Sequence, residues 1–142
     1  MEKEFVPYEI ALQLKELGFD EPCLKVGNPN GHIMWKWIEV DGYPPTVSIN
    51  DIIQVHYSKV WIQIPTFSQA FRWFRDKHNL LNIIDCYIPT PLEWFIRIDK
   101  ISNDSLDYKM DITEESEDKV YLTYEEAELA CIIKLIEIVK TK

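Results

Sequence analysis

Residues 123–140, TYEEAELACIIKLIEIVK, form the stretch that decides the fold. Thr123 followed three residues later by Glu126 has the spacing of a capping box, in which a hydroxyl and a carboxylate each accept a backbone N–H bond. The acidic first turn and Lys140 in the last turn both suit the helix dipole. Apolar side chains cover more than one side of this helix, so it must pack against another helix or against a partner subunit. The sequence therefore predicts a long C-terminal helix, and it leaves open a homodimer that forms through this helix, from Thr123 to Lys140.

Two further helices are predicted nearer the N-terminus. One runs over residues 7–17, because Pro7 suits a first helical turn and Gly18 suits the left-handed residue just past the end. The other begins at Phe67, because Thr66 and Gln69 have the spacing of a second capping box, and it ends near residue 78. Each has one apolar side, made of Ile10, Ala11, Leu14 and Leu17 in the first helix and of Ala70, Phe71 and Phe74 in the second.

Short runs of β-branched, aromatic and aliphatic residues alternate with turn signals between these helices. Before the second helix, strands are expected over residues 33–40, 51–57 and 60–64, with a hairpin tip at residues 28–31. After it, strands are expected over residues 82–88, 93–100 and 106–112, followed by an acidic tip at residues 114–118. The order α-β(n)-α-β(n)-α predicts an α+β fold, with a small, mainly antiparallel sheet packed with three helices in a single domain, residues 1–142.

Composition narrows the class of protein. The 142 residues are 46% hydrophobic and 13% aromatic, as expected for one ordinary domain. Lys and Arg number 15 against 24 Asp and Glu, and the resulting charge of −9 repels polyanions, so general nucleic-acid binding is not expected. No apolar run has the length of a membrane span or a signal peptide, which predicts a cytoplasmic protein with no membrane partner. Cys23, Cys86 and Cys131 lack Cys-x-x-Cys spacing and are expected to be reduced, mostly buried thiols.

Arg72 and Arg75 are the strongest candidates for ligand binding, because they stand three residues apart on the second helix. Two arginines could grip a phosphate or a carboxylate while the ring of Trp73 stacks on a base. Trp61 belongs to a group of strand aromatics that could line a groove. The competing interpretation is a solvated helical face with Trp73 packed at its edge, and strand aromatics that simply form core.

No catalytic residue, metal site or cofactor is predicted. His32, His56 and His78 are scattered and lack the spacing that metal ligands show on a helix. The acidic run from Asp111 to Asp118 lacks the central glycine of a calcium loop. A small hydrolase or nuclease stays open as an alternative, since acids and histidines distant in sequence can converge in one cleft.

Three segments together carry a family resemblance. They are residues 11–23, residues 69–77 (QAFRWFRDK), and residues 123–131 (TYEEAELAC) running on to 134–140 (KLIEIVK). These helical segments resemble a family of small uncharacterised proteins from phages and prophages of gut Bacteroidetes. The match covers somewhat under half of the chain and leaves the strands as its variable part, and the family supplies no catalytic residues.

The resemblance implies a setting. It implies a phage or prophage accessory protein in the cytoplasm of a bacterial host, and a helical scaffold with changeable strands is more typical of a non-enzymatic binding module than of an enzyme. Such a module would engage a host protein, or sequester a small anionic host molecule such as a nucleotide signal, in counter-defence. A structural homodimer without a ligand is the third hypothesis.

Overall fold

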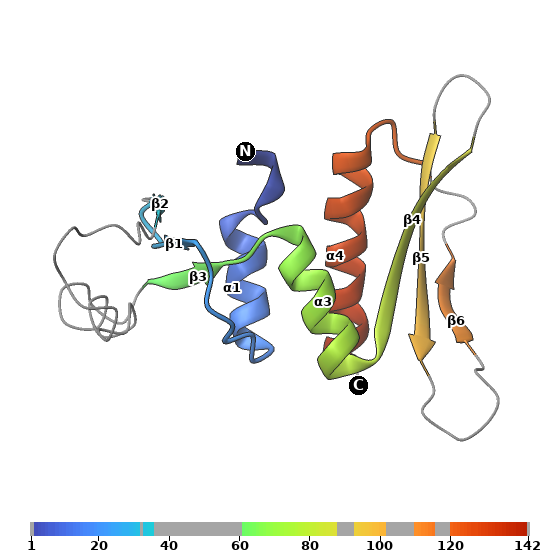
Figure 1. Cartoon of the computed structure of the whole chain (residues 1–142), viewed down its shortest axis with the longest axis horizontal. Coiled ribbons are helices and arrows are strands. Elements are labelled where there is room, and N and C mark those ends of the chain that lie inside the picture. The colour runs from blue at the N-terminus through green and yellow to red at the C-terminus, as the bar shows by residue number, and fades with distance from the viewer. Residues whose placement is uncertain are drawn as a thin grey trace, which may run out of the picture. The chain divides into compact units, whose positions relative to one another are not determined.

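The computed structural model describes residues 2–31, 33–35, 61–87, 93–101, 110–115 and 120–141 (Figure 1). Its contacts divide the chain into two compact units. We call Phe5–Thr66 the N-terminal unit, and Met1–Glu4 together with Phe67–Lys142 the C-terminal unit. Each contains helix and antiparallel sheet, which confirms the α+β class and the predicted order of elements. The expectation that residues 1–142 form a single domain stays a prediction.

Helix α1 (Tyr8–Glu16) is the only helix described in the N-terminal unit, and its start is fixed by a proline. Pro7 has extended backbone angles, and its carbonyl accepts N–H bonds from Ile10 and Ala11 at 3.0 and 2.9 Å. Pro7 therefore immediately precedes the helix, whereas the sequence had suggested a place in its first turn. The predicted core side of the helix is confirmed for Ile10, Ala11 and Leu14, which are all buried, whereas Leu17 at its end is half-buried.

The end of α1 also follows the prediction. Gly18 has a φ of 96°, a left-handed conformation that glycine adopts without a steric penalty. Its N–H donates to the carbonyl of Lys15 at 3.0 Å, and the next N–H, of Phe19, donates to Leu14 at 2.9 Å. This pair of bonds is the Schellman motif. It turns the chain back so that the Phe19 side chain is buried.

A three-stranded antiparallel sheet in the order β2-β1-β3 completes the described part of the N-terminal unit. Its strands are β1 (Lys25–Gly27), β2 (Ile33–Trp35) and β3 (Ile62–Ile64). The predicted hairpin tip joins β1 to β2, where the Asn28 carbonyl accepts the Gly31 N–H at 3.1 Å and the Asn28 side chain accepts the Asn30 N–H at 3.0 Å. Gly31 has a φ of 80°, so the turn needs its glycine.

The C-terminal unit contains longer elements. Helix α3 (Phe67–His78) begins and ends where the sequence predicts. It leads into an antiparallel meander in the order β4-β5-β6, with β4 (Leu80–Tyr87), β5 (Glu93–Ile101) and β6 (Met110–Glu115). The predicted meander is confirmed. One detail was wrong, because Glu114 and Glu115 lie in β6 and pair with Ile98 and Arg97, whereas the sequence placed them in an acidic tip.

Helix α4 (Tyr124–Lys140) begins at the predicted cap. The Thr123 hydroxyl accepts the Glu126 N–H at 3.2 Å, and the Glu126 carboxylate accepts the Leu122 N–H at 3.1 Å, one residue before the position that a strict capping box would use. The helix packs against α3 and against β4 and β5. The predicted packing of this helix on two sides is therefore satisfied by elements of the C-terminal unit. The homodimer through α4 stays a prediction.

Several expectations fall outside the described residues or change in detail. Residues 36–40, the strand expected over 51–57, and His32 and His56 lie outside them. Where one sheet was expected, the described strands form two sheets of three. The β-pattern at residues 120–122 contributes a single bridge, in which Tyr121 and Trp94 exchange N–H bonds of 2.8 and 2.9 Å.

Candidate functional site

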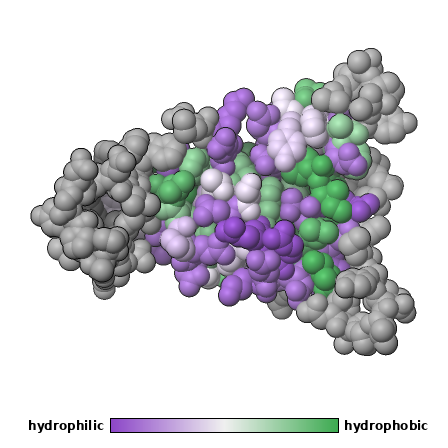
Figure 2. Space-filling view, viewed as in Figure 1, coloured by the Kyte–Doolittle hydropathy of each residue, from purple (hydrophilic) through white to green (hydrophobic). Residues whose placement is uncertain are grey.

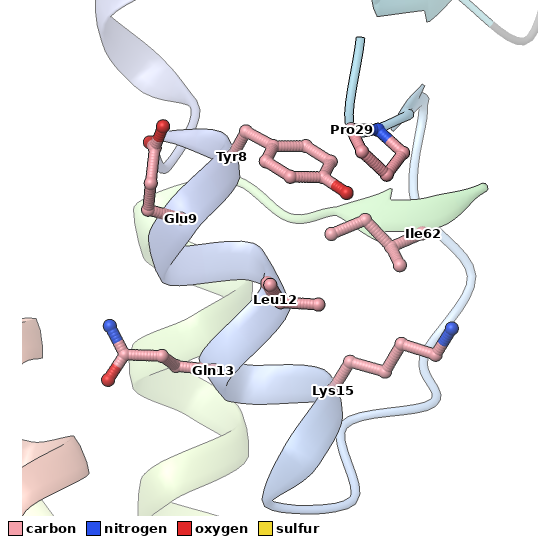
Figure 3. Close-up of a pocket in the computed structure, with 7 residues that line it drawn as sticks. All are labelled: Tyr8, Glu9, Leu12, Gln13, Lys15, Pro29 and Ile62. Atoms are coloured by element: carbon pink, nitrogen blue, oxygen red, sulfur yellow. The ribbon is translucent and has the colours of Figure 1, made fainter. Parts of the chain in front are cut away.

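An open groove on the N-terminal unit is a candidate binding site among the described residues. Successive turns of α1 contribute Tyr8, Leu12 and Lys15 to the groove. These residues are four and three positions apart, so they share one side of the helix. Pro29 from the hairpin turn and Ile62 from β3 lie opposite them (Figure 3). The groove therefore depends on the hairpin and the helix being held side by side.

Gly27 is what allows the Tyr8 ring to lie against β1. A Cβ atom on Gly27 would lie 3.0 Å from Tyr8 Cδ2 and 2.7 Å from the Cδ1 atom of Ile64, closer than packed carbon atoms approach. Ile64 is only 2% exposed, so it has little freedom to move away. Because Gly27 has no side chain, the Tyr8 ring can lie against β1, where it forms the aromatic wall of the groove.

The groove is open to solvent and has a volume of about 600 Å³, within the range of about 300–1,000 Å³ that is usual for small-molecule sites. Its walls are mostly apolar: the Tyr8 ring, Leu12, Pro29 and Ile62. Leu12 is 39% exposed, so apolar surface is left open to solvent there. This combination of an aromatic ring, a proline ring and aliphatic side chains suits a flat apolar ligand.

Lys15 supplies the positive charge of the groove. In Figure 3 its side chain extends along the same side of α1 as the Tyr8 hydroxyl and Leu12, while Glu9 and Gln13, which also line the groove, lie at its other border. A cation beside an apolar wall selects ligands that carry a negative group next to a flat ring. Glu9 also belongs to the lining, so the formal charges of Lys15 and Glu9 offset each other across the groove as a whole, and the positive charge is confined to the Lys15 end.

The arginine pair predicted from the sequence lies on the surface of α3. Arg72 and Arg75 are exposed, and the Nε of Arg75 is 3.3 Å from the Asp76 carboxylate. Trp73 is 2% exposed and packs edge-on against Phe74, with ring centroids 5.0 Å apart. Trp73 is therefore part of the core, and it would have to leave the core to stack on a ligand. The ligand-binding role of the two arginines stays a prediction.

Trp61, the fourth predicted site residue, is half-buried just before β3 and belongs to the N-terminal unit, whereas the other three belong to the C-terminal unit. The groove residues were not predicted. Leu12 was the available signal, because a leucine lies off the side of α1 that carries Ile10, Ala11 and Leu14. The contributions of Pro29 and Ile62 depend on tertiary contacts, which local patterns do not report.

A polar cluster lies in the C-terminal unit. It joins Tyr124, Glu128 and Cys131 on α4, with the Tyr124 ring packed edge-on against Trp94 at 5.1 Å. Burial, together with the nearby Glu128 carboxylate, raises the pKa of the Cys131 thiol to about 12. A thiol with this pKa is protonated at neutral pH and is a poor nucleophile. Cys131 is therefore a core residue, as the sequence suggested.

Burial also raises the pKa of Glu128, helped by the Glu125 charge and opposed by a hydrogen bond from the Tyr124 hydroxyl. The cluster is thus a partly buried carboxyl held by a tyrosine, next to an inert thiol. This arrangement offers no activated nucleophile, and we assign it a structural role in the packing of α4 on β5.

Among the residues that the structure describes, no group of three or more His, Cys, Asp and Glu side chains is placed to hold a metal ion. Within the same ranges, no helix combines the length and apolar character that a membrane span requires. No family model, curated protein or solved structure matches this chain.

Proposed function

We propose that the chain is a non-enzymatic binding module that holds a small anionic molecule with a flat ring, such as a nucleotide, in the groove of its N-terminal unit. The observation that carries the proposal is the convergence of the Tyr8 ring, Pro29 and the Lys15 ammonium on one cavity of about 600 Å³. A base would stack on the two rings, and a phosphate would pair with Lys15. Leu12 and Ile62 would bury the rest of the ring.

The resemblance of the helical segments to phage and prophage proteins supports a setting for this activity. In that setting the module is an accessory protein in the bacterial cytoplasm, and it sequesters a host nucleotide signal or engages a host protein in counter-defence. The acidic surface favours small anions over nucleic acids, because the overall field repels polyanions while one nearby cation acts at short range.

Isothermal titration calorimetry with purine and pyrimidine mononucleotides tests the groove. Lys15→Gln leaves a polar side chain that is one atom shorter and removes the charge, so it should weaken binding by about tenfold or more. Tyr8→Leu should weaken it by a similar factor through lost stacking. Lys77→Gln on α3 is the matched control, because it removes one exposed lysine of the other unit and should leave binding unchanged.

The double variant Arg72→Ala/Arg75→Ala separates the two candidate sites in the same experiment. If it abolishes binding while Lys15→Gln does not, the ligand lies on α3 and the groove proposal is wrong. Conversion of a mononucleotide into a new product by the wild-type chain would instead favour the hydrolase or nuclease alternative. Native mass spectrometry of the chain purified from bacteria should show a bound small anion, and a stoichiometric host protein in its place would shift the proposal to that partner.

A further inference from the structure

The two edges of the sheet in the C-terminal unit differ in how they are protected. Strand β6 carries three acidic residues, Asp111, Glu114 and Glu115, and its pairing with β5 shifts register between Ile98 and Asp99. Charges and irregular pairing are the usual means of keeping a sheet edge from joining another strand. The β6 edge is therefore protected.

Strand β4 forms the other edge and has neither a cluster of charges nor a shift in register. Its eight residues, Leu-Leu-Asn-Ile-Ile-Asp-Cys-Tyr, include neither lysine nor proline and carry one charge, at Asp85. All eight pair with β5 in one continuous register. In the described part of the chain no strand lies beyond β4. Figure 2 shows hydrophobic side chains gathered in a band over β4 and the neighbouring side of α4.

Hydrogen bonds show which backbone groups of β4 face this open edge. Trp94 exchanges its N–H and C=O bonds with Tyr121, so those groups point away from β4, and its partner Cys86 forms a pair without hydrogen bonds to β5. In an antiparallel ladder such pairs alternate with bonded ones. Asn82 and Ile84 lie four and two residues before Cys86, so they also form pairs without hydrogen bonds to β5. Their N–H and C=O groups therefore point outward from the sheet.

We propose that the β4 edge is a dimer interface, in which β4 of a second copy of this chain pairs antiparallel with it to form one continuous six-stranded sheet. When two identical strands pair antiparallel about a two-fold axis, the outward N–H and C=O groups of each copy bond to the same groups of the other copy. Asn82 then exchanges N–H and C=O bonds with Ile84 of the partner subunit. This proposal is independent of the groove and its ligand.

The register follows from the ends of the strand. The Cys86 N–H already donates to its neighbour's carboxylate, Asp85 Oδ1, at 2.8 Å, so pairing that relies on Cys86 is disfavoured. An axis at Asp85 would place two carboxylates opposite each other, which is destabilising. An axis at Ile83 keeps the two Asp85 carboxylates apart and overlaps nearly the whole strand. It uses Cys86 only in the outermost bonded pairs, opposite Leu80 of the partner subunit. It places Ile83 opposite the partner subunit's Ile83, in a pair without hydrogen bonds.

Light scattering on the full chain, coupled to size-exclusion chromatography over a concentration series, should show a dimer. Asn82→Pro removes an outward N–H without removing a bond to β5, and it should raise the dimer dissociation constant by at least about tenfold. Asn82→Ala, which keeps that N–H, is the matched control and should leave the constant within about threefold. Ile83→Lys is a second variant, which places two like charges together on the axis.

Cross-linking tests the register. In a Cys86→Ser background, Ile83→Cys should form an intersubunit disulfide on mild oxidation, because Cα atoms of such pairs lie about 4.5 Å apart. A monomer at every concentration would overturn the proposal. So would a dimer that ignores both Asn82→Pro and Ile83→Lys and gives no cross-link, as a dimer through α4 would. Capture of an added extended peptide by a chain that does not self-associate would also overturn it.

Discussion

The two units of this chain use helix and sheet differently. In the N-terminal unit each described strand has three residues, and α1 keeps one side, with Tyr8, Leu12 and Lys15, along an open groove. In the C-terminal unit β4 and β5 have eight and nine residues, and α3 buries five side chains. Longer strands cover more of a helix. The difference teaches that short strands leave a groove open beside α1, and we expect the C-terminal unit, with its longer strands and more deeply buried helix, to contribute more to stability.

Phe74→Ala should have the largest effect on stability, and this effect should fall on the C-terminal unit. Phe74 is fully buried on α3, so the substitution removes a large apolar side chain and leaves a cavity. We expect the free energy of unfolding to fall by about 3–5 kcal/mol, measured by urea denaturation followed by circular dichroism. Leu12→Ala on α1 is the matched control and should cost about 1 kcal/mol or less, because Leu12 is 39% exposed. Equal losses would contradict the comparison.

Gly27→Ala should have an intermediate effect, on both stability and ligand binding. The added methyl group meets Ile64 and the Tyr8 ring, so we expect a loss of about 1–3 kcal/mol in the free energy of unfolding. Mononucleotide affinity should fall as the Tyr8 ring is displaced. In the Tyr8→Ala background the same substitution should cost less, and a double-mutant cycle measures that coupling. Additive losses would show that the ring does not pack on β1 as described.

Glu128→Gln should have the smallest effect and a defined pH dependence. Burial raises the Glu128 pKa in the folded state, so its contribution to stability is present below the unfolded value near 4.5 and is lost as pH rises. The variant should therefore be more stable than wild type at pH 7, by less than about 0.5 kcal/mol because the site is partly exposed, and the difference should shrink toward pH 4.

Glu125→Gln is the control for that pH dependence. Its own backbone N–H and the Lys3 ammonium, 3.2 Å away, lower the Glu125 pKa, so its contribution is present at neutral pH and lost as pH falls. The sign is opposite to that of Glu128. Thermal melts at pH 4 and pH 7 should show Glu125→Gln less stable than wild type at pH 7. The same sign for both variants would contradict the assigned environments.

The sequence predicted the features that local chemistry controls. Thr66 and Thr123 marked the starts of α3 and α4, and Gly18 marked the end of α1, because helix ends depend on groups within a few residues. It did not predict the groove, since Pro29 and Ile62 reach Tyr8 only through tertiary contacts. The sequence left open whether Trp73 stacks on a ligand or packs at the edge of a solvated face, and it could not predict burial as deep as 2% exposure, which depends on tertiary contacts.

The central claim is that the open side of α1 binds a small anion with a flat ring. The most direct measurement is a ¹H–¹⁵N correlation NMR titration of the full chain with adenosine and guanosine monophosphates. We expect the largest shift changes at the amides of Tyr8, Leu12, Lys15 and Gly27, and none of similar size along α3. Changes centred on Arg72 and Arg75 with an unaffected α1 would contradict the claim, as would the absence of any change at saturating nucleotide.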